Sequence, residues 1–344
     1  MKKRRHYRIK PRFFMILALF ILLLGIIGLW VHHPSRSVTG SPIEVLKPSI
    51  ATYYTLPAVS LPTPLAGAAI FQQNGVLTLA GGSTPHGPSD WIDTLTDHGI
   101  VQWRPLPHAA RGGALISTGS QLAYIGGILS GQTHPTAQTQ LIGASGHLPI
   151  LPQPLAHFAT AYTSQAAWII GGGSGHKPSS TIWKISVSSL TPTIWGHLPH
   201  GVYDAAAAIS AKDLWVIGGR SALGPSKAVW EISRRTHHLI ATYLLPTPIY
   251  NAAAVLWHHQ LWIIGGQTGP HHPVAAIDVL THHHLTTVTQ PLPTALAQAA
   301  VSVQGNAVWI IGGQTSHGPS ATIYAVHARP KMPISPAHSH RHSS

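Results

Sequence analysis

The chain has 344 residues and no cysteine, and its 21 lysine and arginine residues outnumber its 8 aspartate and glutamate residues, which gives a net charge of +13. The lack of cysteine excludes disulfides, thiolate metal sites and cysteine nucleophiles. Seven of the basic residues lie before Phe13, so the remainder is only mildly basic, and we expect no nucleic-acid binding.

The N-terminal part of the chain predicts a membrane anchor. A basic segment at 1–12 precedes an uncharged apolar run at 13–31, which is just long enough to cross a bilayer as a helix. The positive-inside rule places the basic segment in the cytoplasm and the rest of the chain outside. A cleaved signal peptide is the alternative, but no small-x-small site follows the run. We therefore expect an uncleaved single-pass anchor, then a linker at 32–48 rich in proline, serine and glycine.

From residue 49 to residue 328 the chain repeats one pattern six times, an apolar run that ends in two glycines. The first glycines of successive pairs are 45, 45, 47, 47 and 47 residues apart, and a Leu-Pro pair lies 20 residues before each of them. A fixed period of this size marks a repeat architecture. The pairs are Gly81 and Gly82, Gly126 and Gly127, Gly171 and Gly172, Gly218 and Gly219, Gly265 and Gly266, and Gly312 and Gly313.

Each copy divides into four short strands. In the fourth copy these are "AAAAIS" from Ala205, "DLWVIGG" from Asp213, "KAVWEIS" from Lys227 and "LIATYLLP" from Leu239. The runs are apolar or alternating and are bounded by turn residues, which is typical of strands, and beyond the anchor no helical period appears. Paired glycines allow close backbone packing and positive φ at the turn that leaves the second strand. We predict an all-β fold.

The repeat resembles the kelch repeat, in which a glycine pair closes the second strand and aromatic residues follow later. Trp183, Trp230 and Tyr324 are similar to its third-strand aromatic residue, and Trp103 and Trp195 to its fourth-strand tryptophan. The resemblance implies a six-bladed β-propeller, with one four-stranded blade per copy around a central channel.

The two ends of the repeat region predict how the ring closes. After the third strand of the last copy, the tail at 329–344 is rich in proline and histidine and makes a poor fourth strand. The segment 49–61 resembles the fourth strand of another copy, so we expect it to supply the outer strand of the sixth blade. We expect the tail to be disordered.

The kelch resemblance also implies that ligands bind on the face that carries the loop entering each innermost strand. Arg111 would hold an anionic group, Tyr203 and Tyr250 would stack on a sugar ring, and Asp204, Asn251 and Gln298 would bind hydroxyls. Alternatively, these groups only bond backbone and water at a channel entrance. With His157 included, the predicted ligand-binding residues are Arg111, His157, Tyr203, Asp204, Tyr250, Asn251 and Gln298.

A second set of loops on the same face, between the second and third strands, is rich in histidine. These residues are surface histidines or a protonatable rim that attracts anions, since equivalent positions on different blades are too far apart for a metal site. We expect no metal and no cofactor. The histidines are His86, His134, His176, His271, His272 and His317.

Two functions are compatible with these residues. The first is a binding module, held at the membrane, for a protein or a cell-envelope glycan; the oligomeric state is not indicated. The second is an enzyme similar to the bacterial sialic acid mutarotase, an exported kelch propeller. In that case Arg111 would hold the sugar carboxylate and His157 or Asp204 would move protons. No catalytic motif is recognisable and charges are few, so we favour the binding module and assign no catalytic residue.

Overall fold

The computed structural model describes residues 52–55, 60–96, 99–102, 105–143, 150–175 and 177–328. The predicted anchor at 13–31, the linker and the tail at 329–344 lie outside these residues, as do Trp103 and His176. Within the described ranges there is no helix that is both long and apolar enough to span a membrane.

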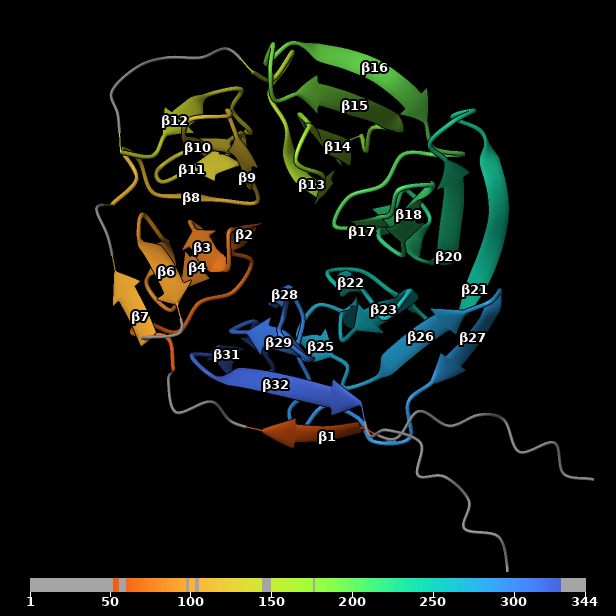
Figure 1. Cartoon of the computed structure of the whole chain (residues 1–344). Helices are drawn as coiled ribbons and strands as arrows, with labels where there is room; N and C mark the ends of the chain where they lie inside the picture. Colours follow the sequence, from red (N-terminus) through yellow and green to blue (C-terminus); the bar gives the residue numbers. More distant parts are fainter. Residues whose placement is uncertain are drawn as a thin grey trace, which may run out of the picture. The chain divides into compact units, whose positions relative to one another are not determined.

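Six antiparallel sheets, the blades, lie around a common centre, one for each sequence copy (Figure 1). In the lists that follow, the strands of each blade run from the innermost to the outermost. Blade 1 contains β2 (Ala69–Gln73), β3 (Val76–Ala80), β6 (Ile92–Thr96) and β7 (Gly99–Gln102). Blade 2 contains β9 (Ala114–Ser117), β10 (Leu122–Ile125) and β12 (Thr139–Leu141) among the described residues. Blade 3 contains β13 (Ala156–Tyr162), β14 (Ala166–Gly173), β15 (Thr181–Ser186) and β16 (Pro192–His197).

Blade 4 contains β17 (Ala206–Ile209), β18 (Asp213–Ile217), β20 (Gly224–Ser233) and β21 (Leu239–Ile249). Blade 5 contains β22 (Ala253–Trp257), β23 (Gln260–Ile264), β26 (Ile277–Thr281) and β27 (His284–Thr287). Blade 6 contains β28 (Ala300–Gln304), β29 (Ala307–Ile311), β32 (Ile323–Ala328) and β1 (Thr52–Thr55). The prediction of an all-β, six-bladed propeller is confirmed.

The blades have two faces, which we name by their connections. The loop face carries the links between blades and the connections from second to third strands. The turn face carries the tight turns that join first to second and third to fourth strands. Short paired strands on the loop face are β4 (Ser83–Thr84) with β5 (Gly87–Pro88), β8 (Ala110–Arg111) with β11 (Ile128–Leu129), β19 (Arg220–Ser221) with the start of β20, β24 (Gln267–Gly269) with β25 (His272–Pro273), and β30 (Gln314–Thr315) with β31 (Gly318–Pro319).

The core lies between blades, because each sheet is covered on both sides by its neighbours. Trp168 and Ile182 of blade 3 pack in one cluster with Leu214 and Val216 of blade 4, and all four are at most 1% exposed. Burying a side chain of this size stabilises the fold by about 1.5 to 3 kcal/mol. The second strands are accordingly mainly apolar, and β14 is buried along its whole length.

The glycine pairs join the blades. In every blade the second glycine donates its N–H to a carbonyl of the next blade, as Gly266 does to Leu296 O at 2.8 Å. The first glycine packs on the same carbonyl, and a Cβ on Gly265 would lie only 2.2 Å from Leu296 O. Both glycines have positive φ. One pair per blade is therefore required at each of the six joints.

The ring closes between the two ends of the propeller. β1 pairs with β32 as the outer strand of blade 6, with Thr52 opposite Ala328, and it lies within the segment 49–61 singled out in the sequence. Gly313 of blade 6 donates to Leu65 O of blade 1 at 2.8 Å, as at the other joints. Because β32 starts near the loop face, its last residue, Ala328, and the facing Thr52 lie on the turn face.

Candidate functional site

The innermost strands enclose a channel of about 540 Å³. Its walls are mainly alanine, including residues 205–208 and 252–254, because six strands converge there and large side chains would collide. Toward the loop face the channel opens among Arg111, His157, Asp204, Asn251 and Gln298. Farther toward the turn face the lining includes the apolar side chains of Ile209, Leu256 and Val303, together with Gln72, whose Oε1 accepts a hydrogen bond from Ser302 at 2.7 Å. The charged and imidazole side chains that line the channel are therefore all at its loop-face mouth.

One residue per blade forms a ring at this mouth, and all six residues have left-handed backbone. They are Gly67, Gly112, His157, Asp204, Asn251 and Gln298, with φ between 53° and 68°. Five backbone hydrogen bonds link them from blade to blade, for example Asp204 N–H to His157 O at 2.8 Å. Among the described residues no such bond joins Gly112 to Gly67. Glycine, asparagine, aspartate and histidine tolerate this conformation best, so the backbone explains part of the composition of the ring.

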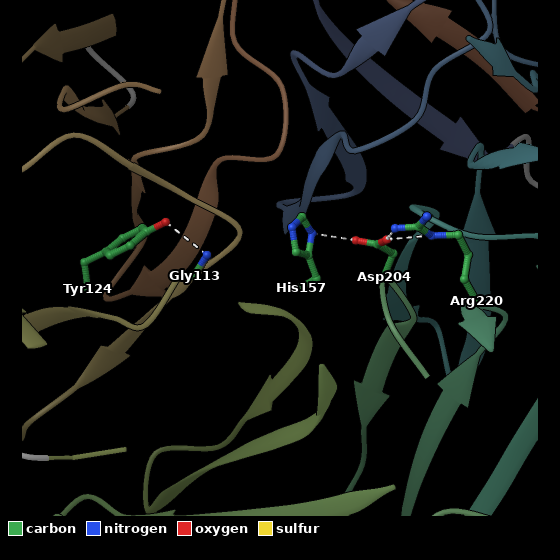
Figure 2. A network of polar contacts seen from close by, with 5 residues as sticks. All are labelled: Gly113, Tyr124, His157, Asp204 and Arg220. Atoms are coloured by element: carbon green, nitrogen blue, oxygen red, sulfur yellow. Dashed lines mark hydrogen bonds and ion pairs between the residues drawn. The ribbon is translucent and has the colours of Figure 1, made fainter. Parts of the chain in front are cut away.

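Three side chains of the mouth form one network (Figure 2). His157 Nδ1 lies 2.9 Å from Asp204 Oδ1, and Arg220 reaches Asp204 Oδ2 with Nε at 2.9 Å and Nη2 at 2.5 Å. The Asp204 side chain is 4% exposed, whereas those of His157 and Arg220 are 33% and 45% exposed. A buried carboxylate is thus fixed between two partly exposed cationic or protonatable groups.

Burial of the Asp204 carboxyl acts to raise its pKa, but the hydrogen bonds and charges of His157 and Arg220 outweigh burial and hold that pKa below its usual range. Asp204 therefore stays ionised in mildly acidic solution. An ionised Asp204 accepts from His157 Nδ1, which leaves Nε2 of a neutral imidazole as a proton acceptor. The network can orient an imidazole for binding or for proton transfer.

Two glycines of blade 2 shape the wall beside His157. A Cβ on Gly112 would be in ordinary van der Waals contact with the His157 ring, at 3.5 Å, so glycine is favoured there by its φ of 68° and not by lack of space. Gly113 donates its N–H to the hydroxyl of Tyr124 at 3.1 Å, as Figure 2 shows. Tyr124 is fully buried, and burial raises the pKa of its hydroxyl, so the phenol stays neutral. Tyr124 thus holds the blade 2 loop that contains Gly112, where the ring of backbone hydrogen bonds is interrupted.

Five of the seven predicted ligand-binding residues line the channel: Arg111, His157, Asp204, Asn251 and Gln298. The two tyrosines do not. Tyr203 turns back over blade 3, where its hydroxyl donates to Gly175 O. Tyr250 is 5% exposed, and the guanidinium of Arg220 lies 4.8 Å from the centre of its ring. The Tyr250 ring is thus part of the support of Arg220 and does not line the channel.

Sequence reasoning missed Arg220, although a signal existed. Arg220 follows the glycine pair of blade 4 directly, at a position that is serine, isoleucine, glycine or glutamine in the other copies. A charge that appears in one copy only, next to Asp204 in phase, indicates a local ion pair. The pairing itself, with two bonds to one carboxylate oxygen, required the structure.

Arg111 differs from Arg220 because it forms no ion pair with any described residue. It is exposed and lines both the channel and an adjoining cleft of about 490 Å³ between the loops of blades 1 and 2. The cleft is also lined by Ser83, Thr84 and Gln132. Arg111 is therefore the cation at this mouth that is available to an anionic ligand.

The loop-face histidines His86, His134, His271, His272 and His317 are all exposed. Within the described ranges no three histidine, aspartate or glutamate side chains are grouped so as to hold a metal ion.

Comparison with known proteins identifies the fold but does not indicate an activity. No protein-family model and no curated protein matches the chain. Among solved structures 1056 chains match, so the fold by itself cannot select a function. One of them is the structure of YjhT, which aligns with a TM-score of 0.69 and 15% identity over 80% of this chain and 98% of that chain. Identity this low shows a shared propeller fold alone.

Proposed function

We propose that the protein is a membrane-anchored, extracytoplasmic propeller of the kelch type that binds the acidic end of a cell-envelope glycan, or an acidic group of a partner protein, at the loop-face mouth. One observation carries the proposal: Arg111 has no ion-pair partner among the described residues and lies beside a polar, asymmetric mouth. Asn251 and Gln298 support it, because neither side-chain amide forms a hydrogen bond within the described structure and both line the channel. A ligand that places a carboxylate on Arg111 and hydroxyls on these two amides would be an acidic sugar.

Screening the full chain against a glycan array tests this proposal. Replacing Arg111 with alanine is expected to weaken binding of acidic glycans about tenfold or more, since a hydrogen bond to a charged group is worth about 1.5 to 3 kcal/mol. Binding of neutral glycans should be unaffected. Lys177→Ala is the matched control, because Lys177 is an exposed cation on the loop face outside the channel. Equal binding by wild type and Arg111→Ala would remove the assigned site.

The His157–Asp204 contact of 2.9 Å supports a second candidate, a sugar-active enzyme resembling the bacterial sialic acid mutarotase. Interconversion of anomers needs a base to take the proton of the anomeric hydroxyl and an acid to protonate the ring oxygen. In this candidate His157 Nε2, with Nδ1 held by Asp204, would take the proton of the anomeric hydroxyl and give it to the ring oxygen as the ring opens, and the reverse transfer would close the ring. The site would then act on the ligand that it binds.

The pH dependence of sialic acid anomer interconversion, followed by NMR, tests this candidate. The mechanism needs both an unprotonated His157 Nε2 and an ionised Asp204, so acceleration should be lost in acid. Because the pKa of Asp204 is lowered, its carboxylate stays ionised in mildly acidic solution, and protonation of Asp204 is not what causes a loss there. No acceleration over buffer by the wild type would exclude the enzyme and leave the binding module.

A further inference from the structure

The turn face of blades 4 and 5, which are neighbours in Figure 1, carries a dense group of protonatable and basic side chains. They stand on four turns, between β17 and β18, β20 and β21, β22 and β23, and β26 and β27. We call them the basic turn patch. Its members are Lys212, Arg234, Arg235, His237, His238, His258, His259, His282, His283 and His284, all exposed except the half-buried Arg234.

Carboxyl groups near this patch are few and enclosed. Glu231 is 8% exposed and accepts a hydrogen bond from the Tyr243 hydroxyl at 2.6 Å. Asp213 is half-buried, and burial together with the charge of Glu231 raises its pKa. No other described carboxylate lies on these four turns. At neutral pH three basic side chains face these two carboxyl groups, so the patch is nearly balanced, and protonation of seven histidines would make it strongly positive.

The other groups that face the patch do not offset this charge. Tyr243, also approached by His283 Nδ1 at 2.6 Å, has a pKa raised by burial and by Glu231, so it stays neutral. Asn306 of blade 6, which is uncharged, accepts a hydrogen bond from His258 Nε2 at its Oδ1, 3.1 Å away. Toward blade 3, Lys184 lies over the Trp168 ring and adds a cation, and toward blade 6 His327 is a further protonatable group.

The chain enters the propeller on this same face. Thr52, the first described residue, pairs with Ala328 at the turn-face end of β32. β1 is held next to blade 5, because the Tyr54 hydroxyl donates to Gln290 O at 2.8 Å. The described chain therefore begins, at Thr52, on the same face as the basic turn patch, and the channel mouth is on the opposite face.

We propose that the basic turn patch docks the propeller onto an anionic lipid surface when its histidines are protonated. A cation close to such a surface strengthens binding roughly fivefold, and several act together. Docking would hold the turn face against the bilayer in mildly acidic surroundings and leave the loop-face mouth open. The inference rests on the anchor in the proposed function but not on the ligand site, so the two can fail separately.

A single-cysteine probe tests this orientation, because the chain has no cysteine of its own. Ala211 and Ala222 are exposed alanines on blade 4, the first on the turn face and the second on the loop face. The full chain carrying Ala211→Cys or Ala222→Cys is labelled with a fluorophore and inserted in nanodiscs. Discs of phosphatidylcholine alone are compared with discs containing an equal part of phosphatidylglycerol. Quenching by acrylamide is measured at about pH 7.5 and about pH 5.5.

In the anionic discs, acidification is expected to reduce quenching of the Ala211→Cys probe at least about threefold, with little change at Ala222→Cys. The triple variant His259→Asn, His282→Asn and His284→Asn should lose most of the effect; asparagine tolerates the left-handed backbone of His259 and His282. The matched control His271→Asn, His272→Asn and His317→Asn removes three loop-face histidines and should keep it.

Protection that is equal in phosphatidylcholine discs would indicate a neighbouring protein chain and overturn the lipid assignment, as would protection of both probes or of neither. Binding of an acidic glycan is measured in the same discs. If glycan binding persists while the probes show no acid-dependent protection, docking is excluded and the binding site stands. If only glycan binding fails, the proposed function fails and docking stands.

Discussion

Replacing Gly265 with alanine is expected to lower the free energy of unfolding by about 4 kcal/mol. Gly265 has φ of 60°, a conformation that costs an alanine about 1 to 2 kcal/mol. The new Cβ would lie 2.2 Å from Leu296 O, so blades 5 and 6 would have to separate. That carbonyl accepts the N–H of Gly266, and the bond would be lost or weakened. Thermal unfolding should show a midpoint about 10 °C lower.

Gly305→Ala is the control for this prediction. Gly305 also has positive φ, 55°, but a Cβ there would meet nothing within 4 Å. Its substitution should cost only the conformational part, about 1 kcal/mol. If the two variants unfold at the same temperature, the joint between blades does not depend on close approach of the backbones, and the explanation of the glycine pairs is wrong.

The structural importance of the glycine pairs could be predicted because they recur at the same position in every copy. The requirement for glycine arises at each joint between two blades. Periodicity reports what every blade must do, such as presenting one N–H and no side chain to the next blade. The closing strand followed from the same logic, since a propeller with one incomplete last blade needs a strand from elsewhere. The repeats were thus sufficient to predict the fold.

The candidate site could be predicted only in part, because it depends on residues that differ from one copy to the next. Phase selected His157 and Asp204 as neighbours around the mouth, and they do meet. Phase could not give the direction of a side chain, so Tyr203 and Tyr250 were expected in the mouth, whereas one packs on blade 3 and the other under Arg220. Tyr203 and Tyr250 each precede a left-handed residue, and the direction of their side chains follows from contacts across blades, which one copy does not contain.

The left-handed ring also changes what its residue types mean. Asp204, Asn251 and His157 suit positive φ, so their presence alone does not indicate a ligand. What the backbone does not require is a second cation aimed at Asp204, or an arginine at the mouth without an ion-pair partner. Arg220 and Arg111 are therefore better indicators of function than the ring residues that occupy the same position in each repeat.

Replacing Asp204 with asparagine is expected to have the largest effect on the site. Asparagine keeps the shape and tolerates φ of 54°, so the change removes charge and little else. Arg220 and His157 lose a shared carboxylate, and we expect the free energy of unfolding at neutral pH to fall by about 2 kcal/mol, because both partners are partly exposed. Anomer interconversion, where it occurs, should fall about a hundredfold because His157 is no longer held.

Asp278→Asn is the matched control, and the two variants should differ in sign with pH. The folded-state pKa of Asp204 is lowered, so its stabilising effect is present above the ordinary aspartate pKa and is lost as the pH falls through the folded value. Burial raises the pKa of Asp278, whose one side-chain hydrogen bond among the described residues is from Thr287 at 2.5 Å, so the folded state gains stability as the pH falls through that raised value.

Chemical denaturation across pH therefore separates the two aspartates. The free energy of unfolding of Asp204→Asn should fall below that of wild type most at neutral pH, and the difference should shrink in acid. Asp278→Asn should be as stable as wild type or more stable at neutral pH, and less stable than wild type in acid. Ligand binding should change only in Asp204→Asn, because Asp278 does not line the channel. A deficit of Asp204→Asn that is the same at every pH would show that the carboxylate is not held ionised by His157 and Arg220, and the network would then have no part in orienting the imidazole.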